Sequence, residues 1–155
     1  MLVLIASLAS LAVASASQYW GGLQPCVLCW YQRYPYMAIA ALGIIGLVVA
    51  GRPGVLRFVL LLAALAFFVD AGIAAFHVGV EQHWWAGTSE CGSDIDLNIS
   101  PEELKHLLLN QPVVRCDAPA WVMFGISMAG YNFLYAALCG VATLGAAVRA
   151  RRAAA

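Results

Sequence analysis

Four long apolar stretches constrain the fold of this chain more than any other feature of its sequence. They cover residues of about 1–17, 34–50, 58–78 and 120–148. Each approaches or exceeds the roughly 17–25 residues that a helix needs to cross a bilayer. Of the 155 residues, 63% are hydrophobic and only 10% are charged, which is too much apolar surface for a soluble domain of this size to bury. We therefore predict a single membrane domain over residues 1–155.

The same stretches predict an all-α fold. Lipid offers the backbone no hydrogen bonds, and the stretches lack the alternation of a membrane β-barrel, so each span should be a helix. The sequence thus predicts a four-helix transmembrane bundle with both termini on one side. The first stretch could also be a signal peptide, because Ala14-Ser15-Ala16 resembles a cleavage site. No Lys or Arg precedes that stretch, however, so we expect a retained helix.

Basic residues predict the orientation of the bundle. Arginines follow the second and the fourth span, namely Arg52, Arg57, Arg149, Arg151 and Arg152. Positive residues favour the cytoplasmic side of a membrane, so both termini should be cytoplasmic. The connections at about 18–33 and 79–119 should then lie on the outer side.

A C-x-x-C formed by Cys26 and Cys29 stands where the first outer loop runs into the second apolar stretch. This spacing occurs in zinc knuckles, in haem attachment sites and in thioredoxin-like redox motifs. Trp30 stands where haem attachment needs His, and no alternating strands indicate a thioredoxin fold. A zinc ion would have to recruit Cys91 and Cys116, at a spacing that structural zinc sites seldom show. The pattern favours a redox-active pair.

The other cysteines allow more than one interpretation. Cys91 and Cys116 share the predicted outer side with the C-x-x-C, and disulfides persist in such a compartment. They could form an inert structural disulfide or a second redox pair. A C-x-x-C closes too small a ring to stabilise a fold strongly, so the functional interpretation is favoured for Cys26 and Cys29. Cys139 lies within a span, where a free cysteine usually packs as a small apolar residue.

Two further sequence patterns predict local structure. Asp70 and His77 are seven residues apart on one helix face, which should look into the bundle. We interpret Asp70 as a structural contact to Ser127 or Asn132. In the second outer loop, Ser100-Pro101-Glu102-Glu103 has the pattern of a capped helix start. A leucine stripe follows it, formed by Leu104, Leu107 and Leu108. This segment predicts a short amphipathic helix on the bilayer surface.

The residues from Pro25 to Arg33, together with the Cys91/Cys116 pair and Arg115-Cys116-Asp117, resemble the DsbB family of bacterial disulfide-forming membrane proteins. In that family, a loop pair takes electrons from a soluble periplasmic thiol oxidase, DsbA, and passes them to the C-x-x-C. A bound quinone then receives the electrons. The match departs from the family at Gln32, where an acidic residue is expected in some members.

The resemblance implies a function and a site. Cys26, Cys29, Cys91 and Cys116 would be catalytic. Arg33, one helical turn after Cys29, would bind a quinone, either ubiquinone or menaquinone, and stabilise the negative charge on its oxygen. His77 would hydrogen-bond the quinone or relay a proton, although it could equally be mere lining. The expected partners are a DsbA-like oxidase, the quinone and lipid of the bacterial inner membrane, with no metal and no nucleic acid.

Three alternatives remain at this point. A vitamin K epoxide reductase-like enzyme shares the four-helix bundle, the C-x-x-C and a quinone-type substrate. A non-catalytic membrane scaffold would use both cysteine pairs as staples. A metal-binding membrane protein would hold zinc through the four outer thiols.

Overall fold

The computed structural model describes residues 1–91, 100, 102 and 114–152. Four long helices dominate these residues: α1 (Leu2–Tyr19), α2 (Val27–Val48), α3 (Pro53–Glu81) and α5 (Met128–Arg152). A short 3-10 helix, η1 (Ser89–Cys91), and a hairpin of β1 (Val122–Met123) and β2 (Ile126–Ser127) complete the described elements. The all-α prediction therefore holds, apart from this two-stranded hairpin.

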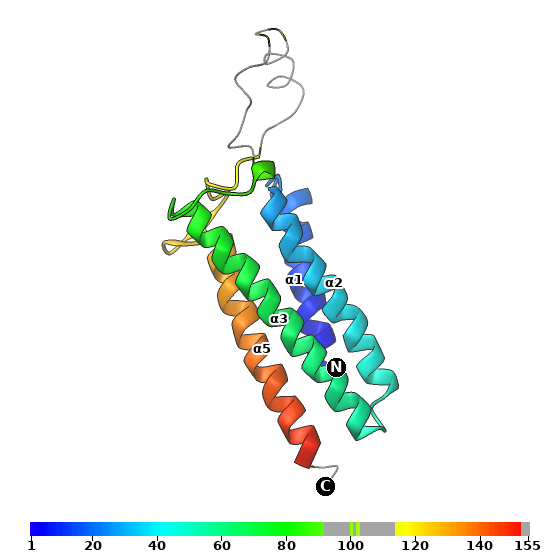
Figure 1. Cartoon of the computed structure of the whole chain (residues 1–155). Coiled ribbons are helices and arrows are strands. Elements are labelled where there is room, and N and C mark those ends of the chain that lie inside the picture. Colours follow the sequence, from blue (N-terminus) through cyan, green and yellow to red (C-terminus); the bar gives the residue numbers. More distant parts are fainter. Residues whose placement is uncertain (92–99, 101, 103–113, 153–155) are drawn as a thin grey trace.

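The long helices run side by side as a bundle (Figure 1). α3 packs against both α2 and α5, whereas α1 packs mainly on α2. Small residues allow close approach at these interfaces, as is common between membrane helices. Gly43 of α2 lies against Leu4 of α1, and Gly140 of α5 lies against the ring of Phe68.

A buried cluster holds the middle of the bundle together. Tyr36 and Ile39 of α2 pack against Phe67 of α3. The rings of Tyr36 and Phe67 meet edge to face, with centroids 6.1 Å apart. Cys139 packs against this cluster from α5, as expected of a small apolar residue.

The outward faces of the helices suit a lipid environment. Large apolar side chains stand exposed along them, for example Leu65, Leu134 and Leu138. α1, α3 and α5 are each long and apolar enough to cross a membrane, so the protein is a multi-pass membrane protein. α2 is not among these helices, and its first half carries Gln32 and Arg33. The four-span topology therefore stays a prediction.

Three helices begin elsewhere than the sequence predicted, and one of them, α3, begins at Pro53 rather than near residue 58. α2 begins at Val27, inside the predicted loop 18–33, because the sulfur of Cys26 caps it by accepting a hydrogen bond from the Cys29 amide at 3.2 Å. The last helix begins at Met128 rather than near residue 120, because the hairpin comes first. The turn of this hairpin has left-handed backbone conformations at Phe124 (φ 50) and Gly125 (φ 79).

The amphipathic helix predicted after Ser100 lies outside the described residues, except at Ser100 and Glu102.

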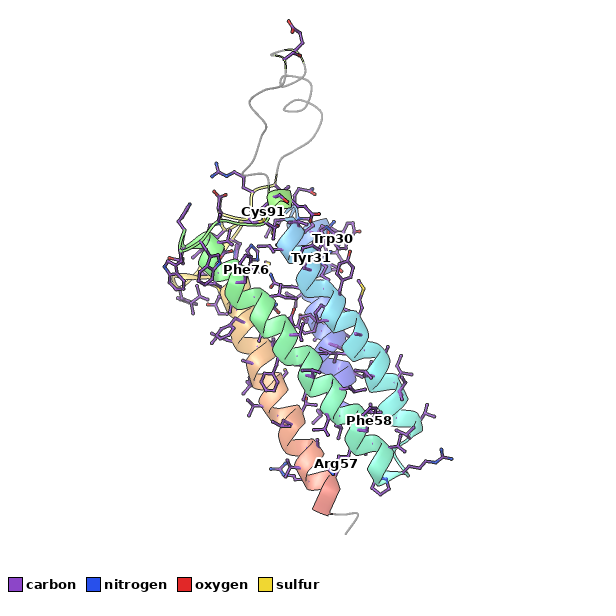
Figure 2. The ribbon with its side chains drawn as sticks, viewed as in Figure 1. Trp30, Tyr31, Arg57, Phe58, Phe76 and Cys91 are labelled. Carbon is purple, nitrogen blue, oxygen red and sulfur yellow. A yellow bond between two sulfur atoms is a disulfide. The ribbon has the colours of Figure 1, made fainter. Side chains whose placement is uncertain are left out.

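The chain folds back onto α3 after its last turn. The Trp85 indole donates to the carbonyl of Phe76 at 3.0 Å and stacks on the Phe76 ring. The six-membered ring of the Trp85 indole lies against Gly79. From there the chain continues to η1, which carries Cys91. Figure 2 shows Phe76 and Cys91 at the same end of the bundle, opposite to Arg57.

Candidate functional site

The two cysteine pairs that the sequence predicts on the outer side meet at one end of the bundle. Cys91 and Cys116 form a disulfide with a sequence separation of 25. Both are buried in a cluster with Cys26, Leu28 and Val80, and Cys29 packs against that cluster. The hydroxyl of Tyr31 also donates to a carboxylate oxygen of Glu90, which ties η1 to α2. The loop disulfide therefore packs directly against the start of α2 (Figure 2).

Cys26 and Cys29 are thiols in this structure, and their sulfurs lie 2.8 Å apart. A disulfide bond is about 2.05 Å long, so a small movement would join them. They stand at the start of α2, within the segment 18–33 that the sequence places outside the membrane. The hydrogen bond from Cys26 lowers the pKa of Cys29, and the same bond raises the pKa of Cys26. Cys29 is thus the first to become a thiolate.

A cavity of about 400 Å³ lies beside the C-x-x-C. All four long helices contribute to it, together with residues that follow the loop disulfide. Its lining is largely apolar, and the polar side chains in it include Cys26, Cys29, Gln32, Arg33, His77, Glu81, Arg115 and Asn132. Its volume falls in the range of about 300–1,000 Å³ that is typical of small-molecule sites. The cavity can therefore hold an aromatic head group next to the Cys29 sulfur.

Arg33 joins α2 to α1 at the edge of this cavity. It donates from Nη1 to the side-chain oxygen of Gln18 at 2.8 Å and from Nη2 to the carbonyl of Ala14 at 3.1 Å. Its guanidinium also lies 4.5 Å from the centre of the Trp30 ring. A guanidinium has five N–H donors, so these two bonds do not exhaust it. Arg33 can still donate to an oxygen of a bound ligand.

His77 is the other predicted ligand-binding residue, and it lies against the C-x-x-C. Its Nε2 is 3.6 Å from the Cys26 sulfur, and its Nδ1 is 2.8 Å from the side-chain nitrogen of Gln32. It is only 4% exposed. The structure therefore brings His77 to the cavity wall and to the thiols together.

A buried polar network continues from Gln32 into the bundle. Asn132 of α5 donates to Oε1 of Gln32 at 2.7 Å and to Oδ2 of Asp70 at 2.9 Å. Its own oxygen accepts a hydrogen bond from Tyr36. The predicted contact between Asp70 and Asn132 is thus confirmed, whereas the Ser127 hydroxyl accepts from the Gly130 amide.

Sequence reasoning missed several residues of the site. In the sequence, Gln32 stands out only as a departure from a family pattern, and Gln18 carries no signal of a role in the site. Glu81 lines the cavity one helical turn after His77, with their polar atoms 3.9 Å apart. The same face-sharing argument that linked Asp70 and His77 would have found Glu81 one turn further along. No such signal was available for Gln18, which comes from another helix.

The cysteine arrangement also tests the zinc alternative. Zinc binding through four outer thiols does not fit, because Cys91 and Cys116 are joined to each other. Within the described residues, the ligand atoms of Cys26, Cys29 and His77 do lie within 4.8 Å of one another.

Comparison with known proteins decides the family. Residues 1–146 match the family described as "Disulfide bond formation protein DsbB". The chain belongs to the DsbB family. A relative named disulfide bond formation protein B, from Herminiimonas arsenicoxydans, is 36% identical over 135 residues, which are 78% of this chain and 82% of the relative.

Two other relatives extend over more of this chain. Another protein of that name, from Xanthomonas oryzae pv. oryzae, is 30% identical over 92% of this chain and 84% of its own length. An uncharacterized protein of Rickettsia prowazekii is 29% identical over 86% of this chain and 77% of its own length. No solved structure matches the chain significantly. As a DsbB-family member with two cysteine pairs at one end of its helix bundle, the protein is a disulfide-forming membrane oxidoreductase.

Proposed function

We propose that this DsbB-family protein carries electrons from soluble thiols on its outer side to a quinone in the membrane. One observation supports this proposal above all others, which is the position of the C-x-x-C. Cys26 packs in one buried cluster with the Cys91–Cys116 disulfide, while Cys29 and Arg33 line the apolar cavity. The C-x-x-C thus has a second disulfide on one side and a ligand-sized space on the other.

The first steps are thiol–disulfide exchanges. A partner thiolate attacks the Cys91–Cys116 disulfide, forms a mixed disulfide and, when its second thiol closes, leaves two loop thiols. One of these attacks an oxidised Cys26–Cys29 disulfide in the same way. Each complete exchange breaks one S–S bond, forms another and moves two electrons. The partner would be a DsbA-like periplasmic thiol oxidase with its own C-x-x-C.

In the last step, the reduced C-x-x-C passes its electrons to an acceptor in the cavity. A quinone, either ubiquinone or menaquinone, supplies the acceptor for two electrons and two protons. Arg33 would hold a quinone oxygen and stabilise negative charge on it, and His77 would complete the wall beside Cys26. The apolar lining with few polar groups fits such a ring. Catalysis in this proposal rests on Cys26, Cys29, Cys91 and Cys116.

The proposed location is the bacterial inner membrane, with both termini cytoplasmic. The cysteines lie at one end of the bundle, and Arg52, at the start of α3, and Arg57, in the first turns of α3, lie at the other (Figure 2). The excess of arginine at that end supports a cytoplasmic assignment for it.

The decisive experiment mixes the purified protein with a reduced C-x-x-C partner and a soluble quinone analogue, and follows quinone absorbance. We expect catalytic loss of quinone together with oxidation of the partner. Replacing both Cys91 and Cys116 by Ser should stop electron flow from the partner, while a small dithiol should still reduce the quinone through Cys26 and Cys29. A disulfide-stapled scaffold would reduce no quinone from either donor, and that outcome would refute the proposal.

A further inference from the structure

The two nitrogens of the His77 ring face partners of different kinds. Nδ1 is 2.8 Å from Nε2 of Gln32. Nε2 is 3.6 Å from the Cys26 sulfur and 3.9 Å from Oε1 of Glu81. A neutral imidazole carries its proton on one nitrogen only, so the hydrogen bond at Nδ1 decides what Nε2 offers to Cys26.

The orientation of the Gln32 amide is fixed by a backbone carbonyl. Nε2 of Gln32 also lies 3.2 Å from the carbonyl oxygen of Leu28. A carbonyl oxygen can only accept, so the NH₂ end of the amide must be the end that faces Leu28 and His77. Turning the amide over would place two oxygens against each other.

The hydrogen bond at the oxygen end of the Gln32 amide is consistent with this orientation. Oε1 of Gln32 accepts from Nδ2 of Asn132 at 2.7 Å. The Asn132 amide is oriented in turn by Asp70, which accepts from Nδ2, and by Tyr36, which donates to Oδ1 at 2.7 Å. Every donor in this chain of bonds therefore meets an acceptor.

We propose that Gln32 is a positioning residue that holds His77 as the Nε2–H tautomer, so that this N–H donates to Cys26 and stabilises its thiolate. Because Gln32 donates to Nδ1, that nitrogen is an acceptor and the imidazole proton lies on Nε2. The Cys26 sulfur is within hydrogen-bond reach of this proton, whereas the Glu81 oxygen lies beyond it. The backbone carbonyl of Cys116 is a second acceptor that faces the ring, and it too requires a ring N–H. His77 is then a hydrogen-bond donor to the buried sulfur and not a base that removes its proton.

This assignment matters for closing the dithiol, and it rests on the proposed function for its biological use. Closure forms one Sγ–Sγ bond, breaks two S–H bonds and passes two electrons and two protons to an oxidant, which in the proposed function is a quinone. Cys26 is 4% exposed, so water does little to stabilise its thiolate. The amide of Cys29 and Nε2–H of His77 supply two donors in place of water.

The same tautomer bears on metal binding. Cys26, Cys29 and His77 are close enough to hold an ion, but a metal needs a lone pair from Nε2. In this hydrogen-bond network, the lone pair of the imidazole lies on Nδ1 and is occupied by Gln32. The network therefore favours thiol chemistry over metal ligation at this cluster.

The tautomer can be measured directly by ¹⁵N NMR of the reduced, histidine-labelled protein in detergent, with His77→Gln to assign the signals. We expect the shifts of a neutral ring with a protonated Nε2 and an unprotonated Nδ1. The opposite pattern in the unsubstituted protein would overturn the proposal without any variant having to fold. This readout also does not depend on whether the protein reduces a quinone.

Two substitutions and a control test the role of Gln32. In Gln32→Glu, a carboxylate accepts from Nδ1–H, so the signals should change to the reversed tautomer or to a charged ring. Gln32→Met removes the donor at similar size and should give mixed tautomers. Gln82→Glu adds the same charge at the exposed end of α3 and should leave the His77 signals unchanged. Unchanged signals in Gln32→Glu would contradict the proposal.

The chemical consequence is measured with a small disulfide oxidant, which bypasses the quinone. In a background of Cys91→Ser and Cys116→Ser, oxidised glutathione forms a mixed disulfide with Cys29, and Cys26 then attacks the Cys29 sulfur and releases glutathione. Gln32→Met should slow this release about threefold, because a tenfold loss of thiolate is partly offset by a more nucleophilic sulfur. An equal rate in Gln32→Met would refute the role in catalysis. Failure of quinone reduction alone would refute only the proposed function.

Discussion

Arg33 donates a hydrogen bond to the side-chain oxygen of Gln18 at 2.8 Å, and this bond joins the redox helix α2 to the last turn of α1. Gln18 thereby fixes one edge of the guanidinium while the cavity lies beside it. The cation of the proposed quinone site is thus held between two helices that are consecutive in the chain, whereas the cavity itself is lined by all four long helices.

Replacing Arg33 by Met should lower the rate of quinone reduction about tenfold or more, which corresponds to about 1.4 kcal/mol in the barrier. The reason is that reduction places negative charge on oxygen in a poorly solvated site, where a fixed cation stabilises it. Arg33→Lys should recover part of the rate, because the charge survives and the planar fork does not. Stopped-flow absorbance of the quinone measures both variants.

The control for Arg33 is the first electron transfer. Single-turnover oxidation of the reduced partner by the Cys91–Cys116 disulfide should stay near the unsubstituted rate in Arg33→Met. Gln18→Met, which keeps the cation but removes its anchor, should have a smaller effect on quinone reduction. If the first transfer collapses while quinone affinity is unchanged, Arg33 serves partner docking or folding instead.

The pH dependence of thiol alkylation should distinguish Cys29 from Cys26. The pKa of Cys29 is lowered by its hydrogen bond from Cys26, so its alkylation should reach half its maximal rate below the ordinary thiol value of about 9. Cys26 should react only at higher pH, because the same bond raises its pKa. Iodoacetamide labelling of the reduced protein, with peptide mapping in a Cys91→Ser/Cys116→Ser background, gives both profiles.

Removing the hydrogen bond provides the matching control for this titration. In Cys26→Ala the donor is lost, so the alkylation midpoint of Cys29 should rise. If the pKa of Cys29 depended on burial alone, the midpoint would not change in Cys26→Ala. An unchanged midpoint would therefore contradict the hydrogen bond between Cys26 and Cys29 as the cause of the lowered pKa.

The loop disulfide should form a covalent intermediate with a partner. Attack on Cys91–Cys116 must pass through a mixed disulfide. Replacing one loop cysteine by Ser, together with the resolving cysteine of the partner, should trap that species as a band on a non-reducing gel. Both Cys91→Ser and Cys116→Ser are to be tried. Continued oxidation of the partner with no trapped band in either case would make this disulfide a structural staple.

The buried network predicts a large loss of stability at Asn132. Asn132→Leu leaves Gln32, Asp70 and Tyr36 each without one hydrogen-bond partner, so the free energy of unfolding should fall by roughly 1–3 kcal/mol. Thermal unfolding in detergent measures this change. Leu138→Ala is the control, because Leu138 is 70% exposed on the same helix and should change stability little. Equal effects of the two substitutions would mean that the network adds no stability.

A labelling experiment tests the topology. Single cysteines at the exposed positions Gly54 and Ser89, in a cysteine-free background, should differ toward a membrane-impermeant thiol reagent in intact cells. Ser89→Cys should react and Gly54→Cys should not. The reversed pattern would place the redox cysteines in the reducing cytoplasm, where disulfides do not persist.

The sequence was a good guide to elements and a poorer guide to contacts between them. Long apolar stretches predicted the helices because backbone hydrogen bonding in lipid leaves little choice. Their ends were less predictable, since the cap at Cys26 and the turn at Phe124 and Gly125 depend on local geometry. Cysteine positions and spacing indicated the redox pairs.

The polar network shows what sequence alone does not reveal. Gln32 and Asn132 are 100 residues apart, and each looks unremarkable in its own segment. Their pairing follows from how α2 and α5 rotate about their axes, which is set by packing. The contact of Asp70 was predictable because a carboxylate in an apolar span needs a partner, and the last span contains few polar residues that could be that partner.

Because the Trp85 ring lies against Gly79, the residue type at position 79 depends on the residue type at position 85. Any side chain at position 79 would occupy the place of the ring, and the ring would have to leave the end of α3. The segment that carries Cys91 begins at that ring, so its displacement would move the loop disulfide away from Cys26. Among related proteins, positions 79 and 85 should therefore change as a pair, with a larger residue at one accompanied by a smaller residue at the other.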